Sequence, residues 1–447
     1  MIAALREERG ARVALLAAGV GVVLGAGISQ QPLLTVLGVV GLAAGVYCVA
    51  HPNLLIGLIF AGILFDRIGV TGMKLDAFPV TASKLTVLGS IAAWGAHVAL
   101  SRARLLVWHP VLTALSALVL LTAVQIAITD TLDVGKFNLA GLGMMTVLVG
   151  LVLAILSGYP LQPLYRFKGT VFAAALALAV VSAGASAGRA SGTMGDPNEW
   201  ATLVLLLTPA LIGGLVDDDH WIARPLRMGI LLLAPLAILL SLSRTALVVG
   251  ALTAPVSLYL LRERRQELAV CLAVAVVGTP LAVDLDYVLF RLRMLVANLQ
   301  GSAVVQDVSL DERTVLFHQG MQLFSDHWLV GVGPGNGPRA SGYTSLTGRL
   351  RPVHNSYLEI ASEQGIIGLL FVAVFAGTVA WTLYQGYRLS SHSADRNRIL
   401  GLSAGLSALA LMAATLGLIT FAMAYLMLGF SLAVVYHARH RGAVADG

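Results

Sequence analysis

The chain has 447 residues, of which 57% are hydrophobic and only 12% are charged, and its mean hydropathy is +0.85. Soluble domains usually carry about 25% charged residues, so this composition excludes an ordinary soluble protein. The net charge of +6 does not call for a nucleic-acid partner, because membrane proteins concentrate Lys and Arg in their cytoplasmic loops.

Apolar runs recur from end to end, which predicts a single integral membrane domain over residues 1–447. Continuous runs such as Ile230–Leu240 favour helices, since the strands of a membrane barrel alternate apolar and polar residues. We therefore expect an all-α, polytopic transmembrane bundle. At ~17–25 residues per span, it has about fourteen spans, at 13–29, 33–50, 53–66, 80–100, 110–129, 139–157, 169–187, 198–215, 226–241, 244–261, 267–283, 355–384, 399–416 and 418–436.

The distribution of positive charge predicts the orientation of these spans. Lys and Arg concentrate in alternate connections, for example at 102–104, 262–265 and 388–398. The positive-inside rule places these connections in the cytoplasm. Both termini are then cytoplasmic, and the long loop at 284–353 is extracytoplasmic.

The long loop is expected to contain short helices. Residues 312–327 have apolar side chains at mixed helical spacing, which predicts a helix lying against the membrane domain. The following Gly-Val-Gly-Pro-Gly-Asn-Gly run at 331–337 is typical of a tight turn.

Two polar clusters interrupt the apolar spans. The first runs from Gly188 to Glu199 and includes Arg189 and the sequence Asp196-Pro197-Asn198. Asp196 before Pro197 is typical of a helix start, so capping is the favoured reading there, whereas Arg189 is either a loop charge or a functional one.

The second cluster is Ser241-Leu-Ser-Arg244-Thr-Ala246, with apolar runs pressed against both sides. Arg244 either extends toward lipid phosphates or faces a cavity within the protein. We favour the cavity, because charged residues at membrane depth usually mark functional sites.

Two further clusters lie at the end of the long loop, on the same side as the first two. Arg313 follows Asp311 and Glu312, a pattern that an ion pair alone would explain. His354-Asn355 directly precedes a span, where Asn355 is a candidate helix cap. Gly365 and Gly368 are three residues apart in that span, which predicts one helical face suited to close packing.

The order of these clusters resembles the O-antigen ligase and polymerase superfamily of bacterial envelope glycan enzymes. The landmarks are Gly-Arg…Gly…Asp-Pro-Asn at 188–198, Leu-Ser-Arg-Thr-Ala at 242–246, the Arg313 segment ending in Gly-Val-Gly-Pro-Gly-Asn at 331–336, and His354-Asn355. The resemblance covers residues 188 to about 370, and the flanking spans match only in character.

The resemblance implies a GT-C-like membrane glycosyltransferase fold in the bacterial inner membrane, with its active site on the extracytoplasmic side. The donor would be a glycan on a polyprenyl (undecaprenyl) diphosphate, and the acceptor a glycan or glycolipid. Arg244 and Arg313 would hold the diphosphate, and His354 would act as the base. The implied substrate-binding residues are Arg189, Asn198 and Asn355.

These residue types suit the chemistry independently. Arginine offers a permanently charged planar fork that fits phosphate oxygens. A sugar diphosphate leaves readily once its charge is held, and histidine takes protons near neutral pH. No Asp-x-Asp sequence or dense His/Glu cluster stands out in the short outside loops, and Cys48 and Cys271 lie in apolar segments. We therefore expect no metal and no cofactor.

Other functions stay open. A transporter or flippase for a lipid-linked or anionic solute would also use intramembrane arginines, although the sequence has no evident internal repeat. A purely structural membrane partner would leave Arg244 and His354 unexplained. Within the enzyme reading, Leu369 stands where ligases usually have a small residue or Tyr, which favours a polymerase slightly over an O-antigen ligase.

Overall fold

The computed structural model describes most of the chain from residue 47 onward. The described residues are 47–49, 51–65, 74–75, 78–79, 82–101, 105–186, 190–194, 196–282, 293, 308–342, 350–419 and 421–445. The expected span at 13–29 and nearly all of the one at 33–50 lie outside these ranges, as does Arg189.

The described part of the chain is almost entirely helical. A small antiparallel pair of two-residue strands, β1 (Lys74–Leu75) and β2 (Phe78–Pro79), is the exception within it. The helices are α3 (Asn53–Leu64), α4 (Ala82–Ser101), α5 (Pro110–Thr129), α6 (Leu132–Leu156), α7 (Gln162–Ser186), α8 (Pro197–Leu215), α9 (Ala223–Ser241), α10 (Arg244–Leu260), α11 (Arg265–Ala282), α13 (Val308–Asp326), α14 (Gly337–Ser341), α15 (Ser356–Leu389), α16 (Ser393–Met412) and α17 (Ala422–Ala445).

The expected all-helical class is confirmed, because each predicted span from 53–66 onward contains a helix. Among the described helices, seven are long and apolar enough to cross a membrane, namely α5, α6, α7, α8, α9, α15 and α17. The apolar parts of α3, α4 and α10 are shorter. The count of fourteen spans therefore stays a prediction. The helix expected in the long loop is present as α13.

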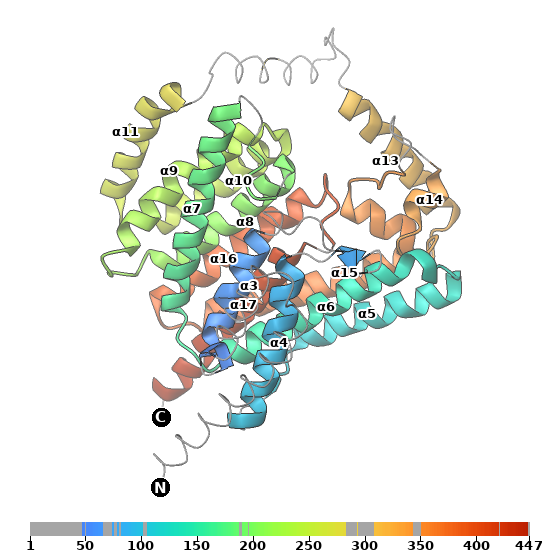
Figure 1. Ribbon diagram of the computed structural model, residues 1–447, viewed down its shortest axis with the longest axis horizontal. Helices are drawn as coiled ribbons and strands as arrows, with labels where there is room; N and C mark the ends of the chain where they lie inside the picture. Colours follow the sequence, from blue (N-terminus) through green and yellow to red (C-terminus); the bar gives the residue numbers. More distant parts are fainter. Residues whose placement is uncertain are drawn as a thin grey trace, which may run out of the picture.

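One end of the bundle gathers the polar clusters, and we call it the motif end. It comprises the C-terminal ends of α5, α9 and α16 and the N-terminal ends of α8, α10 and α15. Gln125 near the end of α5 donates to the carbonyls of Val330 and Gln364, and the Ser356 amide donates to the carbonyl of Ala413 beyond α16. Figure 1 shows α13 and α14 at this end, beside the turn that joins α5 and α6.

The opposite end, here the basic end, holds the arginines that were expected in the cytoplasm. Arg227 is 2% exposed and forms a two-pronged ion pair with Glu267 at 2.7 and 3.0 Å. Arg166 binds Asp218 in the same way, at 2.7 and 2.8 Å. Buried arginines need such partners, because an unpaired charge in the bundle is costly. Predicted inside connections therefore meet at one end of the fold.

Helices α8 and α16 approach each other closely, and glycines make this possible. A Cβ at Gly405 would lie 2.2 Å from the Leu206 carbonyl oxygen, and one at Gly401 would lie 2.2 Å from the Pro209 carbonyl oxygen. Small residues allow this backbone contact between membrane helices. The contact fixes the C-terminal end of α16 beside the start of α8.

The prediction that Gly365 and Gly368 share one helical face is wrong. Gly365 has φ 65° and ψ −163°, so α15 is broken at this residue. The break frees the Ile366 amide, which donates to the Trp328 carbonyl, and a Cβ at Gly365 would lie 2.3 Å from the Leu329 carbonyl oxygen. Gly365 is required because a neighbouring chain segment fills the break.

Candidate active site

His354 lies at the motif end, in the connection that leads into α15. Its backbone has φ 56°, a left-handed conformation that costs a non-glycine residue roughly 1–2 kcal/mol. The side chain of Asn355 accepts hydrogen bonds from the amides of Tyr357 and Leu358, so the expected helix cap is confirmed. The Ser356 hydroxyl donates to the Leu416 carbonyl at 2.7 Å. The strained backbone of His354 is thus held by the anchored start of α15.

Charged groups from three separate segments act electrostatically on the His354 imidazole. Burial lowers its pKa below the ordinary value, and the positive charges of Arg313 and Arg351 lower it further, while the carboxylates of Glu312 and Asp196 act in the opposite direction. A lowered pKa favours the neutral imidazole, which is the form able to accept a proton. The structure therefore brings His354, Arg313 and the Asp196 cluster together.

Arg313 reaches this position because α13 packs against the segment before α15. A Cβ at Gly320 would lie 2.9 Å from the Leu358 side chain and 3.2 Å from that of Val353, so the glycine lets α13 approach. Phe324 packs on the same small apolar cluster. Glu312, beside Arg313, lies 3.6 Å from the Arg351 guanidinium. The N-terminal half of α13 is thereby held on the His354 side.

Arg244 begins α10 at the same end of the bundle and is half-buried. Ala246 in its first turn packs in one apolar cluster with Ala201 of α8 and with Leu416 and Leu418. Leu416 and Leu418 also bond to Ser356. The starts of α10 and α15 therefore attach to the same connection between α16 and α17, which puts Arg244 on the His354 side.

The first polar cluster caps α8, as expected. The Asp196 carboxylate accepts hydrogen bonds from the amides of Asn198 and Glu199, at 2.7 and 3.1 Å. Asn198 is half-buried, and its carbonyl accepts from Thr202. Just before the cap, the Ala190 amide donates to the carbonyl of Leu240, which joins this cluster to the end of α9. Arg189, the neighbour of Ala190, falls outside the described residues.

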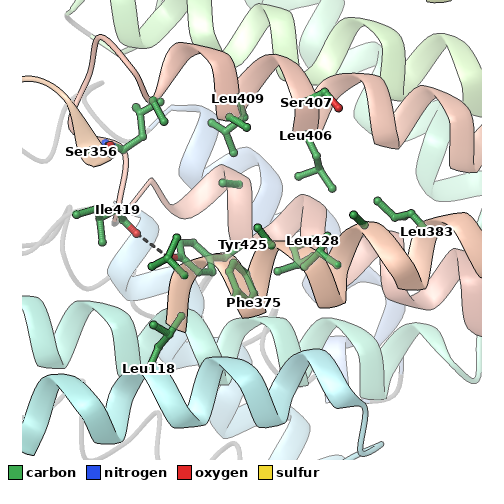
Figure 2. A pocket seen from close by; sticks show the side chains of 18 of the residues that line it. Leu118, Ser356, Phe375, Leu383, Leu406, Ser407, Leu409, Ile419, Tyr425 and Leu428 are labelled. Carbon is green, nitrogen blue, oxygen red and sulfur yellow. Dashed lines mark hydrogen bonds between the residues drawn. The ribbon is translucent and has the colours of Figure 1, made fainter. Parts of the chain in front are cut away.

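An apolar groove of about 610 Å³ opens at the start of α15, between α5, α15, α16 and α17. Figure 2 shows Phe375, Leu406 and Leu428 lining its middle, while Ser356 marks one end. Tyr357 and Gln364 line the groove at that same end, and Tyr384 lies toward the other. The groove thus runs from the residues that follow His354 along the apolar face of α15.

Sequence reasoning missed two residues of this region. Arg351 lies three residues before His354 in an irregular segment, where a single charge gives no signal. Glu363 is 3% exposed and accepts hydrogen bonds from the amides of Gly335 and Gly337. An acidic residue inside an apolar helix was the available signal for Glu363, because such residues are rarely without a role.

The family model described as O-antigen ligase matches residues 229–373. This segment of the chain is similar to O-antigen ligases. The segment includes Arg244, Arg313, His354 and Asn355, whereas Arg189 and Asn198 precede it. The resemblance to the O-antigen ligase and polymerase superfamily is therefore confirmed, and the family supports a multi-pass membrane enzyme of polysaccharide biosynthesis. No curated protein matches the chain.

Proposed function

We propose that this protein transfers a glycan from a polyprenyl diphosphate to an acceptor sugar, with His354 as the base. The observation that carries the proposal is the position of His354: arginines stand beside it, and an apolar groove begins two residues away at Ser356. The O-antigen ligase family supports the same reaction class, since its members handle lipid-linked glycans and acceptors.

In the proposed reaction, Arg244 and Arg313 bind the donor diphosphate. His354 takes the proton of an acceptor hydroxyl, and that oxygen attacks the anomeric carbon. A new glycosidic bond forms as the bond from the anomeric carbon to the phosphate oxygen breaks, and the polyprenyl diphosphate leaves with the electron pair. The two arginines stabilise its charge. Arg189 and Asn198 contribute to donor binding, and Asn355 orients His354 while capping α15.

The groove between α5, α15, α16 and α17 is proposed to hold the polyprenyl tail. Its middle is lined by aliphatic and aromatic side chains, and Ser356 and Gln364 stand at the end nearest His354. From Ile366 to Tyr387, α15 extends on the order of 30 Å at 1.5 Å per residue, which is the thickness of the hydrocarbon layer. A tail in this groove would place its diphosphate at the motif end.

The finer architecture belongs to the same proposal. The chain is a single membrane domain of about fourteen spans with a GT-C-like fold, in the inner membrane. The arginines of the basic end support a cytoplasmic location for that end, and the motif end with the 284–353 loop is then extracytoplasmic.

Among the described residues, His, Cys, Asp and Glu form no group of three or more that could hold a metal ion. Metal independence stays a prediction that chelation tests.

The proposal is tested with purified protein in nanodiscs, given a polyprenyl-diphosphate oligosaccharide and an acceptor. We expect transfer in the presence of EDTA and its loss in Arg244→Ala and Arg313→Ala variants that remain folded. Long products would identify a polymerase, which Leu369 favours, and a single addition to a terminal acceptor an O-antigen ligase. Lipid movement across the bilayer without a new glycan would favour a transporter instead and contradict the proposal.

The groove is tested separately by filling it. Ala380 lines the groove, whereas Val374, on the same helix, does not line it and is 64% exposed. Ala380→Trp is expected to raise the KM for a long-tailed donor and to leave the KM for a short-tailed donor nearly unchanged. Val374→Trp is the matched control and should change neither value. Equal effects of the two tryptophans would contradict a tail site in this groove.

A further inference from the structure

The side chain of Glu363 joins α15 to the glycine-rich turn at 331–337. Its two carboxylate oxygens accept separate hydrogen bonds, from the Gly335 amide at 2.6 Å and from the Gly337 amide at 3.1 Å. Glu363 forms no ion pair within the described part of the chain, so these amides are the groups that offset its desolvation. A Cβ at Gly337 would lie 2.8 Å from one carboxylate oxygen, which explains the glycine there.

The same turn also repairs the break in α15. Where α15 is interrupted at Gly365, the carbonyls of Ser362 and Glu363 accept hydrogen bonds from the amides of Val332 and Gly333, both at 2.9 Å. A Cβ at Gly331 would lie 2.2 Å from the Glu363 carbonyl carbon, so the two backbones are in direct contact. Backbone carbonyls of α15 and the Glu363 side chain thus both bind the turn at 331–337.

This attachment determines where α13 can lie. The chain runs from the end of α13 at Asp326 directly into the turn, and Arg313 lies near the other end of that helix. α13 is held near its middle by the packing of Gly320 against Leu358, near its start by the Glu312–Arg351 contact, and at its end by the turn bound to Glu363. Weakening the attachment at its end would let α13 pivot about Gly320 and move Arg313 relative to His354.

We propose that Glu363 is a positioning residue, which fixes Arg313 beside His354 by binding the turn at 331–337. The proposal rests on the proposed function, in which Arg313 binds the donor diphosphate. Glu363 acts through the backbone of the turn and has no contact with substrate in this account. Because small displacements near a reacting group cost up to about 100-fold in rate, the effect should appear mainly in kcat.

The test uses Glu363→Gln, which keeps the size of the side chain but turns a donor toward one of the two amides. Spin labels on cysteines at exposed Ser325 and Lys136 report the position of α13, in a protein whose buried Cys48 and Cys271 are replaced by alanine. We expect a narrow distance distribution in the parent, a broad one in Glu363→Gln, and a kcat lower by about 10- to 100-fold. Gly337→Ala, which displaces the carboxylate while retaining Glu363, should show the same changes.

The matched control is Glu267→Gln at the basic end, where another buried carboxylate is lost. It should lower the melting temperature but keep the narrow distance distribution and the parental kcat. An equal fall in kcat in this control, or a broad distribution in Glu363→Gln with unchanged kcat, would overturn the proposal. If the parent transfers no glycan, the proposed function fails, while an unchanged distance distribution in Glu363→Gln still refutes the role of Glu363 by itself.

Discussion

The α8–α16 contact gives a direct test of how this bundle is held together. In Gly405→Val, a Cβ would stand 2.2 Å from the Leu206 carbonyl oxygen, and ordinary van der Waals contact begins at 3.4 Å. The two helices must therefore separate by about 1 Å, since backbone atoms cannot rotate away as side chains do. Overpacking of this kind costs about 1–3 kcal/mol, and valine regains only a few tenths of a kcal/mol of helix propensity over glycine.

We expect Gly405→Val to lower the free energy of unfolding by about 2–3 kcal/mol, measured by steric trapping in lipid. The matched control is Gly377→Val on α15, where nothing lies within 4 Å of the added Cβ. That change should stay within about 0.5 kcal/mol of the parent. Equal stability of the two variants would refute the reasoning. Because α16 ends next to Ala413, which binds Ser356, the Gly405 variant should also lose glycan transfer.

Three further predictions concern charge and backbone. The acid limb of the pH–rate profile should lie below the ordinary histidine range, because the lowered pKa of His354 keeps the imidazole neutral to lower pH. Arg351→Gln should move this limb to higher pH, and Glu312→Gln should move it to lower pH. Movement of both variants in the same direction would contradict this explanation. Gly365→Ala should destabilise the protein by at least ~1–2 kcal/mol, because alanine resists φ 65° and meets the Leu329 carbonyl; a melting temperature like that of Gly377→Ala would count against it. Glu267→Gln should cost about 3–5 kcal/mol by leaving Arg227 buried with a weakened partner, and the double change of Arg227 and Glu267 to Met should cost less in the same unfolding assay; additive losses would argue against their coupling.

Hydropathy and caps predicted much of the fold from the sequence. Helices occupy the predicted positions from residue 53 onward because long apolar runs must satisfy their backbone hydrogen bonds internally. Asp196 and Asn355 cap their helices as expected, since their side chains bond to amides only two and three residues away. Such contacts between residues close in the sequence can be predicted from the sequence alone.

Contacts between residues far apart in the sequence could not be predicted in this way. Gly365 and Gly368 have the spacing of a packing face, and only the chain at 328–330, which fills the break, explains the actual conformation. Arg351 approaches Glu312 because α13 packs on the segment before α15. The same holds for Glu363, whose two partners lie in the turn at 331–337. None of these pairs is marked by a regular spacing of residues in the sequence.

The central claim is that His354 removes the proton of the acceptor hydroxyl, and His354→Asn tests it most directly. Asparagine tolerates the left-handed backbone better than alanine does, so the strained connection at φ 56° is retained while the base is lost. We predict that the variant in nanodiscs binds the polyprenyl-diphosphate donor with parental affinity but transfers glycan at least about 100-fold more slowly in a single turnover. Transfer at the parental rate by the folded variant would contradict the account.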